Sequence, residues 1–194
     1  MKSVLWYGYF YYNVPKPDGN EVKQLRSFIH KTVRDLIKKY KTSDPFELAD
    51  AIGVKVRFKD LGNSKGFYRY EELNRYIVIN VHLPQKMQKL VCAHELGHDR
   101  LHINLAKAVA YFHDNSLIDN LGSKPEYEAN LFASELLLND SDIEDCLEFD
   151  YSFDCIASAL CTSQYLLAFK LQSMNARGYD FNIPTNIQSR FLKY

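Results

Sequence analysis

The feature that most constrains this chain is the sequence His94-Glu95-Leu96-Gly97-His98. On an α-helix, residues four apart lie on one face, with about 5–6 Å between their Cβ atoms. Two imidazoles at that spacing can bind one cation through the roughly 2.0–2.1 Å bonds of zinc–nitrogen coordination. Glu95 is rotated about 100° around the helix from His94, so it can lie beside the cation without binding it. The pattern therefore predicts a metal centre with His94 and His98 as ligands and Glu95 as general base.

The residues around this pattern indicate a helix that packs against a sheet. Pro84 suits the first turn of a helix, and the run 90–93 before the first histidine is apolar. Gly97 costs about 1 kcal/mol of helix stability relative to alanine. It is therefore better explained by the close approach of another element than by helix propensity.

A catalytic zinc site needs a third protein ligand and one open position. A second predicted helix, over 125–138, carries Glu126 on the same face as Ala129, Asn130 and Ala133. The two alanines permit a close approach to the metal-binding helix. We therefore predict Glu126 as the third ligand, and Asn130 as a hydrogen-bond partner of a ligating imidazole.

Two alternatives stay open for this position. The sequence Ser-Lys-Pro-Glu over 123–126 has the spacing of a capping box, in which Glu126 would bond to the backbone instead of a metal. Glu128 is the rival metal ligand. Glu128 and Glu135 lie on a different face of the helix, however, and solvated positions are expected for both.

The other histidines are not expected to be metal ligands. His102 continues the face of the ligand pair, but an uninterrupted helix would carry it too far along the axis to share the metal. It is expected to support a ligand by a hydrogen bond or to lie on the surface. Surface positions are expected for His30, His82 and His113.

Periodicity along the chain predicts an α+β protein. We expect a small antiparallel sheet of about three strands, arranged as a meander and packed on the helix of the metal centre, with an N-terminal helix and a C-terminal helical tail. The predicted segments are a helix to about Tyr40, a short helix over 46–52, strands over 54–59, 66–70 and 75–81, a mixed loop to about Lys124, and tail helices over 141–149, 153–160 and 163–175.

The chain is expected to divide into an N-terminal arm (1–20), a metallopeptidase-like domain (21–139) and a helical extension packed on it (140–194). The arm is apolar and aromatic but has no small-residue cleavage site, which indicates an ordered strand or arm and not a signal peptide. No stretch is apolar for long enough to span a membrane. These features favour a cytoplasmic protein.

Charge and cysteine content narrow the function further. The formal net charge is zero, so the whole molecule is not built to bind nucleic acid or an anionic membrane. The segment 23–41 is basic and the segment 140–154 acidic, which fits two solvated helix faces or a polarised surface for a protein partner. The four cysteines form no C-x-x-C pair and are expected to be free thiols, buried or half-buried.

Three segments together resemble the ImmA/IrrE family of metallo-endopeptidases: YIVIN (76–80), LVCAHELGHDRLH (90–102) and EYEANLFASELLL (126–138). The resemblance runs from about Ala49 to Leu138. It implies a cytoplasmic zincin fold. Members of the family commonly lie on prophages or integrative elements and cleave a partner repressor, so the resemblance implies a repressor as the substrate. The position matching the family's glutamate ligand is Glu126, and Asn130 matches its Asp/Asn. Asn139 stands where the family often has proline, a departure that concerns only the helix end.

The hypothesis from sequence is a zinc-dependent endopeptidase that cuts a specific protein, namely a phage or mobile-element repressor, although such sites also accept manganese or iron. The alternative is a non-catalytic, metal-containing regulator that binds a partner or DNA. An interaction module encoded beside a toxin or repressor is a third, minor hypothesis. The tail has a weak helix-turn-helix pattern, but a base-reading helix would offer mainly Gln164, Lys170 and Gln172. Direct nucleic-acid binding is therefore disfavoured, and packing on the domain or docking of a repressor is preferred.

Overall fold

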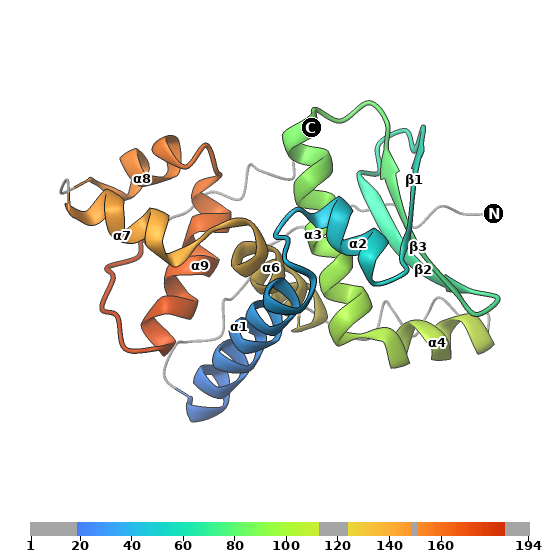
Figure 1. The fold of residues 1–194 in the computed structure, drawn as a ribbon, viewed down its shortest axis with the longest axis horizontal. Coiled ribbons are helices and arrows are strands. Elements are labelled where there is room, and N and C mark those ends of the chain that lie inside the picture. Colours follow the sequence, from blue (N-terminus) through green and yellow to red (C-terminus); the bar gives the residue numbers. More distant parts are fainter. Residues whose placement is uncertain (1–18, 113–123, 149–150, 185–194) are drawn as a thin grey trace.

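The computed structural model describes residues 19–112, 124–148 and 151–184 (Figure 1). The predicted N-terminal arm lies almost wholly outside these ranges, and His113 also lies outside them. The elements, in chain order, are α1 (Asn20–Tyr40), α2 (Pro45–Ala51), β1 (Lys55–Lys59), β2 (Gly66–Glu71), β3 (Asn74–Asn80), α3 (Gln85–Leu101), α4 (Ile103–Phe112), α6 (Lys124–Leu137), α7 (Asp140–Glu148), α8 (Phe153–Ala159) and α9 (Gln164–Ala176).

The predicted α+β class and the three strands are confirmed, but the sheet is mixed and not an antiparallel meander. Its order is β1-β3-β2, with β1 parallel to β3 and β2 antiparallel to β3. The residues Glu72 and Leu73, both with positive φ, turn β2 directly into β3. The longer connection between β1 and β2 leaves β1 to pair on the other side of β3. The strand over 76–80 is therefore interior.

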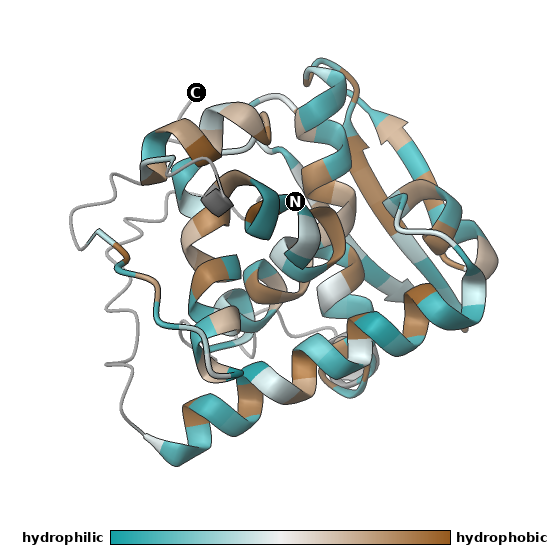
Figure 2. Ribbon diagram, turned by 60° about the vertical axis from the view of Figure 1, so that its left-hand side comes forward, coloured by the Kyte–Doolittle hydropathy of each residue, from teal (hydrophilic) through white to brown (hydrophobic). Residues whose placement is uncertain are grey.

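Helix α3 covers one face of the sheet and carries the predicted metal-binding residues. Ile77 and Ile79 of β3 are fully buried beneath it, and Figure 2 shows the central strand as hydrophobic. β2 comes so close to α3 that a Cβ at Gly66 would lie 2.5 Å from the Val91 side chain. The two layers therefore meet without space for a larger residue at that point.

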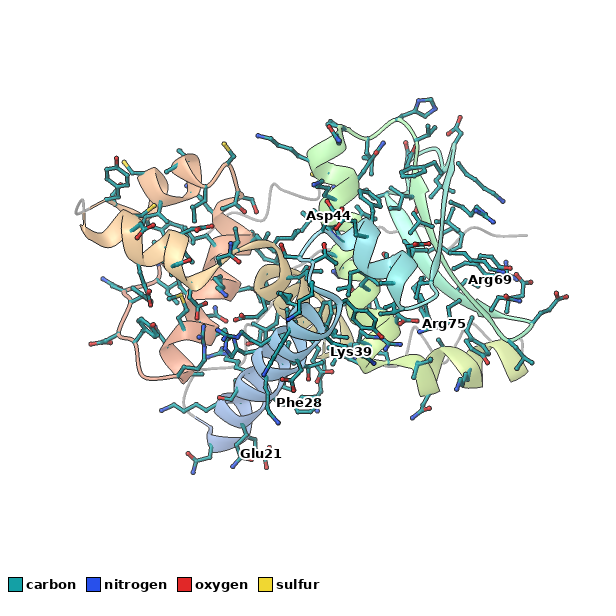
Figure 3. The ribbon with its side chains drawn as sticks, viewed as in Figure 1. Glu21, Phe28, Lys39, Asp44, Arg69 and Arg75 are labelled. Atoms are coloured by element: carbon teal, nitrogen blue, oxygen red, sulfur yellow. The ribbon has the colours of Figure 1, made fainter. Side chains whose placement is uncertain are left out.

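Arg75 ties the sheet to α3 through charge (Figure 3). Its guanidinium lies 3.0 Å from the carboxylate of Asp99, which is completely buried on α3. Arg75 also donates to the carbonyl of Ile52, and Arg100 provides a second cation for Asp99. A buried carboxylate is tolerated when it is paired in this way.

Helix α6 packs on α3 on the side away from the sheet, and α1 and α9 cover α6 in turn (Figure 1). Arg26 of α1 is buried, donating to the hydroxyl of Tyr127 at 2.7 Å and to the amide of Gln172 at 3.0 Å. Leu166 and Phe169 of α9 belong to the main core, while α7, α8 and the other side of α9 enclose a second one. The extension thus packs on the part of the molecule that contains the sheet. The predicted domain boundary between residues 139 and 140 stays a prediction.

A network of buried charges joins α1, α6, α7 and α9. The ammonium group of Lys170, only 2% exposed, lies 2.8 Å from Glu135 and 2.6 Å from Asp140. His30 also bonds to Glu135 at 2.8 Å, and Arg177 bonds to Asp140. The predictions that Glu135 is solvated and that His30 lies at the surface are therefore wrong, since long-range partners draw both into the interior.

The segment after α3 differs from the predicted loop, because 103–112 forms α4. Its Ala- and Leu-containing sequence has good helix propensity. All four cysteines are free, with Cys92 and Cys146 buried but Cys155 and Cys161 exposed. Within the described ranges, no helix combines the length and the apolar character that a membrane crossing requires.

Candidate metal centre

The predicted metal-binding side chains meet at the contact between α3 and α6. His94 and His98 lie one turn apart on α3, and their Nε2 atoms are 3.1 Å apart. Glu126, in the first turn of α6, places its carboxylate oxygens 3.2 Å from His94 Nε2 and 3.3 Å from His98 Nε2. These three donors form one compact group able to surround a single cation.

The spacing of the donors fits a divalent metal. In a tetrahedral site with bonds of 2.0–2.1 Å, neighbouring ligand atoms are about 3.3–3.4 Å apart. The observed separations of 3.1, 3.2 and 3.3 Å are close to that value. The buried Oε2 atom of Glu126 also makes no hydrogen bond, although it lies near His94, and a cation would satisfy it. The group offers two imidazoles and one carboxylate, which leaves a fourth position for water.

The charge state of Glu126 suits a ligand. Burial raises the pKa of this carboxyl, but the adjacent side chains of His94 and His98 outweigh burial and hold the pKa well below its usual range. Burial lowers the pKa of His94, whereas the nearby carboxylates of Glu126 and Glu95 raise it more. The carboxyl of Glu126 is therefore ionised, as a metal ligand must be.

Asn130 supports His94 as predicted from its place one turn beyond Glu126. Its Oδ1 lies 3.0 Å from His94 Nδ1. If Nε2 carries the lone pair for a metal, Nδ1 carries the proton and donates it to the amide oxygen. This contact orients the ring so that Nε2 faces Glu126.

Glu95 lies in the same helical turn, next to the donor group but outside it. Only 5% of the residue is exposed, and the backbone N–H of Tyr68 on β2 donates to its carboxylate. Burial raises the pKa of Glu95, Glu126 adds to the rise, and His94 and His98 lower the pKa in part. A raised carboxyl pKa is what a base needs if it is to pass a proton on at neutral pH.

Glu128, the rival ligand, is not part of the group of donors. Its carboxylate instead bonds to His102 Nε2 at 2.9 Å, and its side chain is only 13% exposed. The prediction that Glu128 is solvated is therefore wrong, because the side chain is largely buried against His102. Ser123, needed for the capping alternative, lies outside the described residues.

The contacts of His102 with both His98 and Glu128, and the involvement of β2, were not predicted from the sequence. His102 is the residue just after α3, with a non-helical φ of −124°, and its ring returns toward His98. The available sequence signal was His102, four residues after His98, together with Glu128, two residues after Glu126. No sequence signal identified the backbone of Tyr68 as a partner of Glu95.

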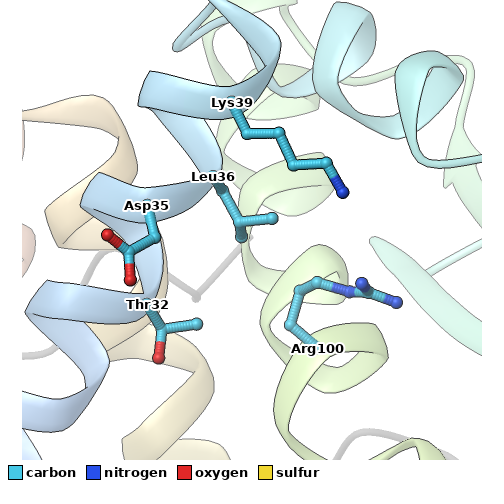
Figure 4. A pocket seen from close by; sticks show the side chains of 5 residues that line it. All are labelled: Thr32, Asp35, Leu36, Lys39 and Arg100. Atoms are coloured by element: carbon cyan, nitrogen blue, oxygen red, sulfur yellow. The ribbon is translucent and has the colours of Figure 1, made fainter.

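A shallow pocket of about 310 Å³ lies between α1 and α3, away from the metal centre (Figure 4). The side chains that line it are Thr32, Asp35, Leu36, Lys39 and Arg100. None of them belongs to the donor group or contacts Glu95. The candidate metal-binding residues therefore lie at the α3–α6 contact and not at this pocket.

Comparison with known proteins agrees with this geometry. Residues 49–160 match the peptidase M78 family model, described as the IrrE N-terminal-like domain. This match covers more than half of the chain and includes all the donor residues. The chain belongs to the ImmA/IrrE family of metallopeptidases.

Two family relatives show how far the similarity extends. Uncharacterized immunity region protein 2 of Bacillus phage phi105 is 42% identical over 132 residues, which are 68% of this chain and 81% of that protein. Metallopeptidase ImmA of Bacillus subtilis (strain 168) is 29% identical over 148 residues, which are 74% of this chain and 84% of that protein. Family membership implies a divalent metal, and the donor group provides a place for it.

Proposed function

We propose that this chain is a zinc-dependent endopeptidase in which His94, His98 and Glu126 hold the metal and Glu95 is the general base. The observation that carries the proposal is the buried Glu95 carboxylate, with a raised pKa, beside three converging donor atoms. Within the described part of the chain, the N–H of Tyr68 and the charged groups of the site are the only partners found for this carboxylate. Its placement suits proton transfer.

Each of these side chains has a different role in the proposed peptide hydrolysis. A zinc ion held by the donor group supplies Lewis acidity, which lowers the pKa of a water molecule to about 7. Glu95 accepts the proton of the attacking water and delivers it to the nitrogen of the leaving amine. Asn130 keeps His94 oriented throughout.

Among the described residues no strand pairs with the outer edge of β2, and this edge supports an extended peptide as the substrate. Asn80 donates to the carbonyl of Lys65, and Phe67 pairs with Val78, so the backbone groups of alternate residues in β2 face β3. Those of Tyr68 therefore face away, consistent with its N–H reaching Glu95. A peptide that adds to this edge would lie beside the general base. We therefore place the added peptide strand beside β2, because β3 is an interior strand.

We propose that the substrate is a protein repressor of a phage or mobile element. The relatives named an immunity region protein of a phage and metallopeptidase ImmA support this choice. Direct reading of DNA by α9 is not supported. Lys170 is buried between carboxylates, while Gln164 bonds to Asp154 and Gln172 to Arg26.

Cleavage of the repressor encoded with this chain tests the proposal. The zinc-loaded protein is incubated with that repressor, and the products are identified by mass spectrometry. We expect the wild type to cut one bond and Glu95→Gln to retain the metal while slowing cleavage by at least about 10²-fold. Glu21→Gln, which alters an exposed glutamate of α1 (Figure 3), serves as the matched control and should cleave normally.

The same experiment distinguishes the alternative of a non-catalytic regulator. A regulator would derepress the element equally well with Glu95→Gln as with the wild type, and no fragment of the repressor would form. Retained cleavage by Glu95→Gln would instead disprove the assigned base. The burial and raised pKa of Glu95 favour catalysis, since binding alone does not need a base there.

A further inference from the structure

Two side chains form a continuous hydrogen-bonded path behind His98. His98 Nδ1 lies 3.1 Å from His102 Nδ1, and His102 Nε2 lies 2.9 Å from the Oε2 atom of Glu128. All three side chains are largely buried, with exposed fractions of 17%, 11% and 13%. We call His102 and Glu128 the His98 relay. It joins the end of α3 to the first turns of α6.

The position of His102 depends on the end of α3. The helix stops at Leu101, and His102 follows with φ −124°. Its backbone N–H still bonds to the carbonyl of His98, so the residue stays within one turn of the ligand. Because the chain leaves the helical path there, the ring of His102 can lie against that of His98, with 5.2 Å between ring centroids.

The hydrogen bonds of the relay have only one consistent direction when His98 Nε2 is a metal ligand. The lone pair is then on Nε2, so the proton of His98 is on Nδ1 and must be donated to a bare Nδ1 of His102. His102 therefore carries its proton on Nε2 and donates it to the carboxylate of Glu128. Any other assignment sets two N–H groups or two lone pairs against each other in one of the contacts.

We propose that His102 and Glu128 are positioning residues that hold His98 in its metal-binding tautomer and orientation. The inference rests on the proposed metal site, but not on the identity of the substrate. The two ligand histidines are then supported differently: His94 by the neutral amide of Asn130, and His98 by a carboxylate acting through a second imidazole. The carboxylate also increases the electron density that His98 offers to the metal.

Zinc affinity of the full chain tests the relay, using competition with a chromogenic chelator. We expect His102→Leu and Glu128→Leu to bind about one zinc at saturation, but with roughly 10–100-fold weaker affinity than the wild type. The double variant should be no weaker than His102→Leu, because that change already disconnects Glu128. Lys124→Ala is the matched control: this lysine is 77% exposed, lies 3.9 Å from Glu128, and is outside the relay.

His102→Gln separates positioning from mere packing. A glutamine can accept the proton of His98 Nδ1 with its carbonyl oxygen and donate to Glu128 with its amide, so it can reproduce the direction of the relay. We expect its zinc affinity to stay within about threefold of the wild type, and the visible spectrum of its cobalt-substituted form to match. Glu128→Gln, which preserves shape, should give a smaller loss than Glu128→Leu and replaces it if that variant does not fold.

Each outcome decides for or against the relay. Unchanged zinc affinity in folded His102→Leu overturns it, as does His102→Gln binding no better than His102→Leu. If the wild type binds one zinc and His102→Leu and Glu128→Leu bind it as tightly, the proposed enzyme is unaffected and only the relay is disproved. A wild type that binds no metal overturns both.

Discussion

Gly97 of α3 lies directly against the backbone of Ala129 in α6. A Cβ at position 97 would lie 2.9 Å from the Cα atom of Ala129 and 3.1 Å from its carbonyl oxygen. Contacts below 3.0 Å to backbone cannot be relieved by a side-chain rotation. The two helices that carry the donor group therefore meet at a position where only glycine fits.

Gly97→Ala should lower both stability and metal affinity. Alanine favours the helix by about 1 kcal/mol, but overpacking against backbone typically costs 1–3 kcal/mol. The strain separates α3 from α6 and moves Glu126 away from the histidines. Chemical denaturation and zinc titration measure the two effects. Lys86→Ala, at an exposed position of the same helix, is the control, and a Gly97→Ala protein with wild-type zinc affinity would contradict the prediction.

Asn130 offers a paired test of the support to His94. Asn130→Leu removes the acceptor 3.0 Å from His94 Nδ1 and should weaken zinc binding by about 10–100-fold. Asn130→Asp supplies a carboxylate acceptor, and charge-assisted bonds are stronger, so its affinity should equal or exceed that of the wild type. The two affinities are compared by chelator competition. Equal losses in both variants would show that Asn130 acts only through packing.

Lys170→Met should destabilise the whole molecule, because it leaves two carboxylates without their central cation. Removing one partner of a buried ion pair costs about 3–5 kcal/mol. The lysine is almost fully buried between Glu135 and Asp140. Urea denaturation measures the loss. Lys38→Met, on the exposed face of α1, should change stability by less than about 0.5 kcal/mol.

Acid should unfold the protein through the same network. Burial raises the pKa of Glu135, but His30 and Lys170 outweigh it and lower the pKa below the ordinary 4.5; Arg177 and Lys170 likewise lower the pKa of Asp140 below 3.8. Because both folded-state pKa values are lowered, their stabilisation is present above pH 4.5 and is lost as the pH falls below it. Denaturation across pH 3–7 should show this decline, and Lys170→Met should show a shallower one.

The convergence of the candidate metal ligands was more predictable from sequence than the sheet. His94, His98, Glu126 and Asn130 lie at helical spacings, and a helix face is a local property that sequence reveals directly. The donor atoms meet as that argument expects. Even the glycine in the pattern indicated the close approach that Ala129 makes.

Pairings between distant elements could not be predicted in the same way. Alternation identified β1, but its parallel pairing with β3 depends on how the chain returns, which periodicity does not record. Glu135 and His30 looked solvated because their partners, Lys170 and each other, are far away in sequence. A charged residue on a helix shows its exposure only once the packed neighbours are known.

The most direct test of the central claim is the zinc content per chain, measured by elemental analysis after equilibration with micromolar zinc and removal of the excess. We predict about one zinc in the wild type and in Glu128→Gln, and almost none in Glu126→Gln, because Glu126, and not Glu128, shares the donor group with His94 and His98. Folding of each protein is checked by circular dichroism. Zinc retained by Glu126→Gln and lost by Glu128→Gln, or a folded wild type without stoichiometric metal, would contradict the account.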